Sequence, residues 1–232
     1  MGGDFAPQAI VEGAVLAANE LPEGVTIVLI GQTEAIQTVL DKQNYTGSNI
    51  KIVEANETIE MGEHPVKALQ AKPNSSIGVG FKLLKTGEID SFGSAGNTGA
   101  MMVGSLFSIK AIEGVQRPAI AGFAPQTNGK MAVMVDIGAN ADVKPEMLEQ
   151  FGLLGSIYYQ ATTGEENPKV GLMNIGEEAE KGSVIAQQAH KLMKENAKMN
   201  FIGNGLFVWS WYSECSCLFT INSWHTMFIF TD

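Results

Sequence analysis

Short apolar runs that end in glycine-rich turns and lead into helical patterns constrain this chain more than any other feature. Such runs occupy residues 25–30, 131–136 and 169–175, and each ends at Gly, Asn or Asp residues. Runs of this length, apolar at nearly every position, are typical of buried parallel strands. Their alternation with helical patterns predicts an α/β protein, with a mostly parallel sheet and helices on both faces.

The remaining elements follow from the same periodicities. Further strands are predicted at 50–53, 89–93, 120–123 and 200–202, and helices at 8–19, 33–40, 75–85, 101–112, 147–161 and 183–196. Thr33 is suited to cap its helix, Pro65 is placed to open another short helix, and Gly87 to break the helix before it. The predicted core therefore covers residues 1–204.

Composition narrows the class of function. The 232 residues carry a formal net charge of −10, and Arg117 is the only arginine, which argues against nucleic acid as a partner. The N-terminus shows no signal-peptide pattern, and Cys215 and Cys217 lie too close together to form a disulfide framework. A cytoplasmic location is therefore expected.

Residues 205–232 differ from everything before them. All three tryptophans and both cysteines lie in this segment, whereas lysine, arginine and proline are absent from it. Neither a strand period nor a helix period continues, and polar interruptions argue against a membrane span. We expect an aberrant tail that arose by a frameshift or a mispredicted end, with a membrane-interface anchor as the alternative.

The loop at 94–100, Ser-Ala-Gly-Asn-Thr-Gly-Ala, is the strongest candidate site. It lies between a predicted strand and a predicted helix, where uncovered backbone N–H groups favour a phosphate or carboxylate. Gly96 and Gly99 allow close approach, and Ser94, Asn97 and Thr98 add polar side chains. The alternative is an ordinary turn in which Asn97 or Thr98 caps the helix.

Three further turns, at 2–4, 136–140 and 174–182, resemble this loop in composition. If all four lie at one edge of the sheet, they line a cleft that is rich in backbone donors, amides and carboxylates. Asp136 either orients a donor or simply closes its own turn. Lys181, among carboxylates, is either a cation for phosphate or an oxyanion, or part of a solvated charged loop.

Other chemistries have little support in the sequence. His64, His190 and His225 have no spacing that indicates a metal site or a Ser–His pair, and both cysteines lie outside the regular region. No Walker motif is present, and no G-x-G-x-x-G opens a helix after a strand. Anion binding with electrostatic activation, without metal, cofactor or covalent enzyme intermediate, is the chemistry that remains.

Five motifs in order resemble the bacterial PlsX-type phosphate acyltransferases. These motifs are MGGD with Ala6-Pro7, SAGNTGA at 94–100, DIGAN at 136–140, GLMNIGEE at 171–178 and NFIGN at 200–204. The resemblance implies attack of inorganic phosphate on the thioester of acyl-[acyl carrier protein], which gives acyl phosphate for phospholipid synthesis. It also implies a three-layer fold similar to isocitrate and isopropylmalate dehydrogenases, a homodimer, peripheral membrane contact, and no metal or cofactor.

The resemblance also assigns roles to residues. Lys181 and Asn97 are the implied catalytic residues. The implied phosphate- or substrate-binding residues are Gly3, Asp4, Ser94, Gly96, Thr98, Gly99, Asp136, Gly138, Asn140 and Asn174.

The chain departs from the family pattern at several places. Phe5 stands where the family usually has a histidine, the strand before Gly2 is missing, and the family continuation after Asn204 is replaced by the tail. We therefore expect a chain truncated at both ends, with phosphate binding favoured over turnover. The alternatives are a non-catalytic phosphate-binding fragment and a phosphotransacetylase that uses acyl-coenzyme A. Hydride transfer lacks a nucleotide fingerprint.

Overall fold

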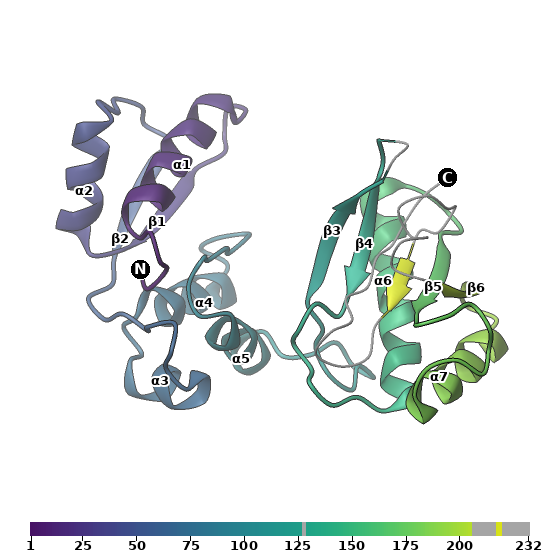
Figure 1. The fold of residues 1–232 in the computed structure, drawn as a ribbon. Coiled ribbons are helices and arrows are strands. Elements are labelled where there is room, and N and C mark those ends of the chain that lie inside the picture. The colour runs from purple at the N-terminus through teal and green to yellow at the C-terminus, as the bar shows by residue number, and fades with distance from the viewer. Residues whose placement is uncertain (127–128, 206–216, 220–232) are drawn as a thin grey trace. The chain divides into compact units, whose positions relative to one another are not determined.

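The computed structural model describes residues 1–126, 129–205 and 217–219. The chain forms two compact units, unit 1 (Met1–Ala111) and unit 2 (Ile112–Asp232), which are described separately (Figure 1). This division is not predicted from the sequence, because the alternation of strands and helices continues across it.

Unit 1 contains a two-stranded parallel sheet and five helices. In chain order these are α1 (Gln8–Glu20), β1 (Ile27–Gly31), α2 (Thr33–Lys42), β2 (Ile50–Glu54), α3 (Pro65–Ala71), α4 (Ser76–Thr86) and α5 (Thr98–Ser108). The strands pair in parallel from Ile27 opposite Ile50 to Gly31 opposite Glu54. The predicted elements at 8–19, 25–30, 33–40, 50–53 and 75–85 are thus confirmed within a few residues.

Two apolar clusters hold unit 1 together. The first lies between the sheet and the helices α1 and α2, with Val11, Val15, Leu29, Ile36 and Leu40 among its buried residues. The second joins α3, α4 and α5 and is built from Ile59, Ala68, Ile77, Phe81 and Ala100. Burial of these side chains, rather than helix propensity, stabilises helices as short as α3.

Some local predictions for unit 1 hold and others do not. Ser75 caps α4 by accepting a hydrogen bond from the Gly78 N–H at 3.2 Å, and Gly87 ends that helix in the left-handed region. Thr33 does not act as a side-chain cap, because its backbone N–H and hydroxyl both donate to Glu54. The predicted strand at 89–93 does not form, because no neighbouring strand pairs with it.

The described residues of unit 2 form a five-stranded sheet and two helices. In chain order these are β3 (Ala121–Pro125), β4 (Met131–Val135), α6 (Pro145–Thr163), β5 (Lys169–Met173), α7 (Val184–Glu195), β6 (Asn200–Gly205) and β7 (Cys217–Phe219). The strand order is β3-β4-β7-β5-β6. Every neighbouring pair is parallel except β3 with β4. A connection as short as 126–130 can only join antiparallel strands.

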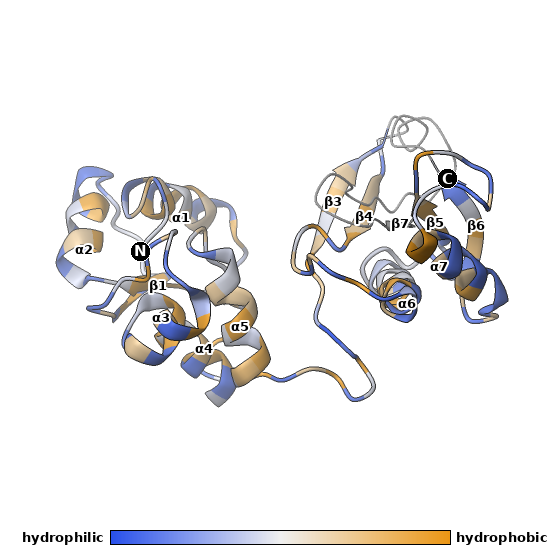
Figure 2. Cartoon of the chain, turned by 60° about the horizontal axis from the view of Figure 1, so that its bottom comes forward, coloured by the Kyte–Doolittle hydropathy of each residue, from blue (hydrophilic) through white to orange (hydrophobic). Residues whose placement is uncertain are grey.

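The core of unit 2 lies between the sheet and the helices α6 and α7. Val133, Leu148, Phe151, Leu172 and Met193 are almost completely buried there. The two helices pack against each other on the same side of the sheet, as Figure 2 shows. The α/β class with mostly parallel pairing is therefore confirmed, whereas the predicted helices on both faces are not found among the described residues of unit 2, where α6 and α7 share one side.

The predicted tail has one described strand. β7 lies between β4 and β5, so Cys217–Phe219 takes part in the sheet of unit 2. Residues 206–216 and 220–232, with the tryptophans, Cys215 and His225, lie outside the described residues. Over the part of the chain that the structure describes, no helix is both long and apolar enough to cross a membrane.

Candidate functional site

The loop at 94–100 forms the N-terminal end of α5. The Ser94 hydroxyl oxygen accepts a hydrogen bond from the Gly96 N–H at 3.1 Å, and Asn97 Oδ1 accepts one from the Ala100 N–H at 2.9 Å. Ser94 and Thr98 are exposed. Within the described residues, the N–H groups of Thr98 and Gly99 have no hydrogen-bond partner. They are the donors that a bound anion would use.

Both polar atoms of the Asn97 side chain form hydrogen bonds with backbone groups. Its exposed fraction is 4%, and its amide nitrogen donates to the carbonyls of Glu60, Met61 and Glu63 at 3.0–3.1 Å. The same residue caps α5 through its amide oxygen. The cap interpretation therefore holds for Asn97, whereas its implied catalytic role stays a prediction.

Gly2 and Gly3 lie where the backbone is crowded. A Cβ on Gly3 would lie 2.8 Å from the Ala95 carbonyl oxygen, and one on Gly2, whose φ is +86°, would lie 2.2 Å from the Ile59 carbonyl oxygen. The turn at 2–4 thus packs directly against the loop at 94–100, with the exposed Asp4 beside it. Two of the four predicted turns are brought together in this unit.

One ion pair supports the segment that Asn97 binds. Lys72 Nζ lies 2.7 Å from Glu63 Oε2 and donates to the Thr58 carbonyl at 2.7 Å. The hydrogen bond from Lys72, with a second from the Glu60 N–H, holds the pKa of Glu63 below its usual value. The ionised carboxylate therefore helps to stabilise residues 58–63.

Replacing Lys72 by methionine is expected to remove a pH-dependent part of the stability of unit 1. Since the folded pKa of Glu63 is lowered, this part is present above the unfolded pKa, near 4.5, and is lost as pH falls through the folded pKa. The variant should therefore be less stable than the parent at pH 7, and the difference should shrink below about pH 4. Urea unfolding at both pH values measures it. Lys67→Met, an exposed change on α3, the helix that Lys72 directly follows, should show no such convergence.

In unit 2, Asp136 organises the turn that follows β4. Its carboxylate accepts hydrogen bonds from the N–H groups of Ile120, Ala139 and Asn140 at 2.8–3.0 Å. The Asn140 side chain adds a fourth at 2.9 Å and also donates to the Pro118 carbonyl. Gly138, with a φ of +105°, is the exposed centre of the turn. The turn-closing interpretation of Asp136 is therefore the one that the geometry favours.

The turn at 174–182 follows β5 and closes on Asn174. The Asn174 side chain donates to the Lys181 carbonyl at 3.0 Å and accepts from the Ile175 N–H at 2.8 Å. A Cβ on Gly182, whose φ is +85°, would lie 2.3 Å from Asn174 Oδ1. The Lys181 stem covers Gly176, where a Cβ would lie 2.7 Å from Lys181 Cγ. Lys181 as a whole is exposed.

Three residues that support this turn were not among the predicted site residues. Asn204 donates to the Glu178 carbonyl at 2.7 Å and contacts His190 Nδ1 at 2.9 Å through Oδ1. Gln187 donates to the Glu180 carbonyl at 2.6 Å. Asn204 ends the last sequence motif, which is a signal that could have identified it. His190 and Gln187 belong to no sequence motif, and their spacing from their partners follows no pattern that could have identified them.

The comparisons with known proteins identify the family. The model of a family described as fatty acid synthesis protein matches residues 1–206. The chain belongs to this family. Every predicted site residue therefore lies in the matched part.

Curated relatives in this family carry the name phosphate acyltransferase. Those of Dictyoglomus thermophilum and Acetivibrio thermocellus are 46% and 47% identical over 204 residues, 88% of this chain and 60% and 59% of theirs. That of Synechocystis is 43% identical over 205 residues, with 88% and 58% covered. The chain thus spans about 60% of the length of these family members.

A solved structure shows a similar fold. The EutD phosphotransacetylase from Staphylococcus aureus has a TM-score of 0.56 and 21% sequence identity, with 84% of this chain and 64% of that chain covered. At this identity the likeness concerns the fold alone. The phosphotransacetylase fold agrees with the α/β class predicted for the family.

The four family turns lie in two pairs, one pair in each unit. The turns at 2–4 and 94–100 are adjacent in unit 1. Those at 136–140 and 174–182 follow β4 and β5, which both pair in parallel with β7 and so end at the same edge. Convergence of all four turns on one cleft stays a prediction. Among the described residues no group of His, Cys, Asp and Glu is arranged to hold a metal ion.

Proposed function

We propose that this protein transfers a fatty acyl group from acyl-[acyl carrier protein] to inorganic phosphate, which gives acyl phosphate for phospholipid synthesis. The support comes from the family match over residues 1–206 and from the relatives named phosphate acyltransferase. The observation that carries the proposal is the start of α5. There, within the described residues, the N–H groups of Thr98 and Gly99 have no hydrogen-bond partner, and the side chains of Ser94 and Thr98 are exposed.

The proposed reaction asks little covalent chemistry of the protein. A phosphate oxygen attacks the thioester carbonyl, the carbon–sulfur bond breaks, and the carrier thiolate leaves and takes up a proton. Phosphate is already a competent nucleophile, so the protein mainly has to hold it near the carbonyl and stabilise the developing oxyanion. Backbone N–H groups and a lysine are suited to this task.

The proposed roles follow the geometry of each unit. Ser94, Gly96, Thr98 and Gly99 would hold phosphate, with Asn97 positioning the first N–H groups of α5. Because Gly3 has no side chain, the turn at 2–4, with Asp4, would lie close to this site. For unit 2, taken by itself, the family resemblance implies a catalytic role for Lys181 and substrate-binding roles for Asp136, Gly138, Asn140 and Asn174.

Other properties implied by the family resemblance are proposals of the same kind. They are a three-layer arrangement like that of isocitrate and isopropylmalate dehydrogenases, a homodimer, peripheral contact with membranes and a cytoplasmic location. Size measurement in solution and cosedimentation with vesicles address the dimer and the membrane contact.

The test of the function is phosphate-dependent release of the carrier thiol from acyl-[acyl carrier protein] by the purified chain. Lys181→Met should lower that rate by about five- to tenfold, since an exposed lysine contributes a modest electrostatic term. Methionine preserves the stem over Gly176, and Lys191→Met on α7 is a matched control that should change nothing.

Two outcomes would contradict the proposed reaction, and a third would contradict the role of Lys181. Thiol release from acyl-coenzyme A but not from the carrier protein would favour a phosphotransacetylase. Phosphate binding in calorimetry without turnover would favour a non-catalytic phosphate-binding protein. Equal effects of Lys181→Met and Lys191→Met would remove the assigned role of Lys181.

A further inference from the structure

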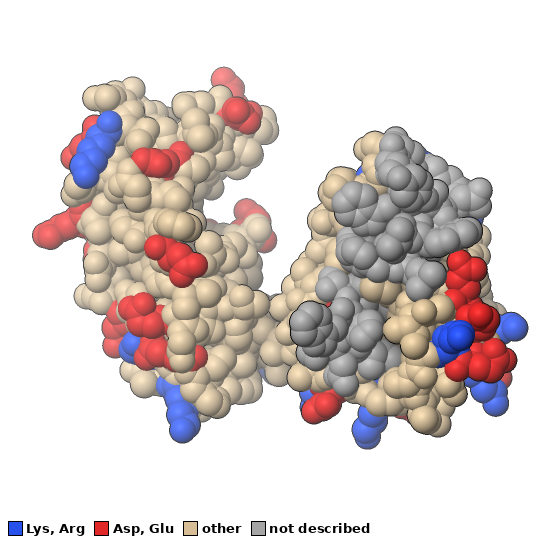
Figure 3. Space-filling model, viewed as in Figure 1, with Lys and Arg blue, Asp and Glu red and all other residues tan. Residues whose placement is uncertain are grey.

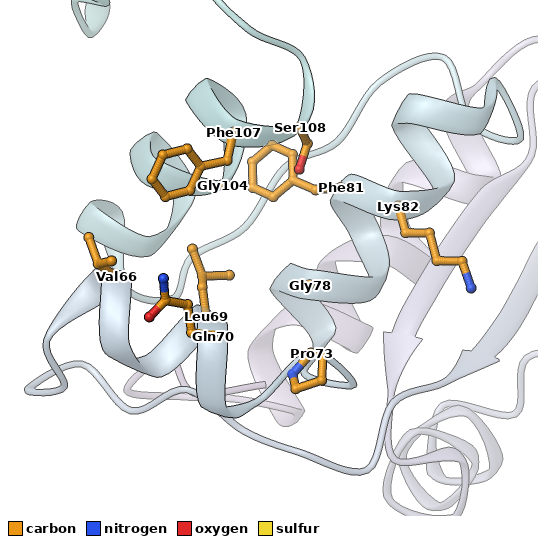
Figure 4. A pocket seen from close by; sticks show the side chains of 10 residues that line it. All are labelled: Val66, Leu69, Gln70, Pro73, Gly78, Phe81, Lys82, Gly104, Phe107 and Ser108. Carbon is orange, nitrogen blue, oxygen red and sulfur yellow. The ribbon is translucent and has the colours of Figure 1, made fainter.

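Unit 1 contains an apolar groove between α3, α4 and α5 (Figure 4), with a volume of about 360 Å³. Its lining residues are Val66, Leu69, Gln70, Pro73, Gly78, Phe81, Lys82, Gly104, Phe107 and Ser108. The volume and the mostly apolar lining with few polar groups are typical of small-molecule sites. The groove therefore has the size and character to take an apolar ligand.

A glycine and one exposed aromatic ring determine the shape of this groove. A Cβ on Gly104 would lie 2.4 Å from the Phe81 ring, so glycine there lets α5 approach α4 closely over the buried Phe81. Phe107 opposite has an exposed fraction of 62%. A large apolar side chain that faces water beside a groove is a feature of binding surfaces.

The helices around the groove differ in charge from the rest of this acidic chain. Carboxylates are common on the face of unit 1 shown in Figure 3. In contrast, residues 64–87 contain four lysines and no Asp or Glu, and residues 91–112 contain Lys110 and again no Asp or Glu. The Lys82 stem lines the groove while its amine points away from the apolar side chains (Figure 4). Lys72 is paired with Glu63, so the other four lysines supply the local positive charge that favours an anionic ligand.

The groove begins next to the loop at 94–100. A Cβ on Gly99 would lie 2.4 Å from the Pro65 ring, and Val66, the next residue, lines the groove. Asn97 also binds the carbonyls of residues 60–63, just before Pro65. If a ligand binds with its anionic end at the loop, the rest of the ligand can therefore lie in the apolar groove next to it.

We infer that this groove holds the apolar chain of an anionic single-chain ligand whose phosphate or carbonyl end lies at the loop. The inference rests on the proposed function for the identity of that ligand, an acyl chain. Groove and loop then act as one site. The N–H groups of α5 bind the anionic end of the ligand, and Phe107, Leu69 and Val66 contact its apolar chain.

Binding of dodecyl phosphate below its micelle-forming concentration, measured by calorimetry on the full chain, tests the inference. Phe107→Ser should weaken binding about tenfold, because a Phe side chain loses its burial against the ligand. Leu106→Ser, the neighbouring exposed change outside the groove, should leave binding intact. Lys82→Glu should weaken it about threefold at low salt, whereas Lys51→Glu on β2 should not.

Several results would overturn the inference. Equal effects of Phe107→Ser and Leu106→Ser would show that the groove is not the binding site. Binding of dodecyltrimethylammonium as tight as that of dodecyl phosphate would show that the site has no preference for an anion. Binding of anionic phospholipid vesicles without binding of monomeric dodecyl phosphate would point to a membrane surface. A dimer in light scattering that Phe107→Ser dissociates would make a second copy the occupant.

The two proposals fail separately. Groove-dependent binding of dodecyl phosphate without acyl phosphate formation would contradict the proposed function and leave the groove assignment standing. Acyl transfer with a chain-length dependence that Phe107→Ser does not alter would contradict the groove assignment and leave the proposed function standing.

Discussion

Replacing Asn97 by alanine is expected to lower the free energy of unfolding of unit 1 by roughly 2–4 kcal/mol. The change removes the cap of α5 and leaves the carbonyls of Glu60, Met61 and Glu63 without their shared donor. A lost cap costs about 1 kcal/mol, and the lost hydrogen bonds to these partly buried carbonyls cost about 1 kcal/mol or more together. Denaturant unfolding of the full chain, followed by hydrogen exchange within residues 1–111, measures the loss.

The same variant should bind phosphate less tightly, because the Thr98 and Gly99 N–H groups lose the frame that orients them. Thr98→Ala is the matched control for stability alone, since its exposed side chain makes no hydrogen bond within the described residues. It should leave stability nearly unchanged. An Asn97→Ala protein as stable as the Thr98→Ala protein would show that the cap and the three carbonyl contacts contribute little.

Replacing Asp136 by alanine is expected to destabilise unit 2 by about 2–4 kcal/mol. One carboxylate accepts four hydrogen bonds in the turn after β4, and charge-assisted hydrogen bonds are stronger than neutral ones. Asp136→Asn keeps one accepting oxygen and should lose about half as much. Hydrogen exchange of the amides of Ala139 and Asn140 reports the opening of the turn directly.

Asp142→Ala provides the comparison for this change, because Asp142 is exposed a few residues further along the same segment. Its unfolding midpoint should match that of the parent chain. Equal stability of the Asp136→Ala and Asp142→Ala proteins would mean that the turn is held by its neighbours rather than by the carboxylate.

Local signals in the sequence predicted most elements well. The apolar runs at 131–136 and 169–175 form β4 and β5. The helix predicted from Ser75 forms as α4, which ends at Gly87 as expected. Such features depend on neighbours within a few residues, as caps and buried strands do. The run at 89–93 failed because a strand needs a pairing partner, which no local pattern supplies.

The loop at 94–100 shows where sequence and tertiary structure divide. Its glycines, its helix-capping Asn97 and the family motifs were all readable from the sequence, because caps and turns follow local residue chemistry. Only the fold decided that Asn97 reaches back to residues 60–63 and that Gly3 packs on Ala95. It also decided that Pro65 leads from the loop into an apolar groove. These contacts join residues more than 30 positions apart, and such contacts depend on how the elements pack rather than on any local pattern.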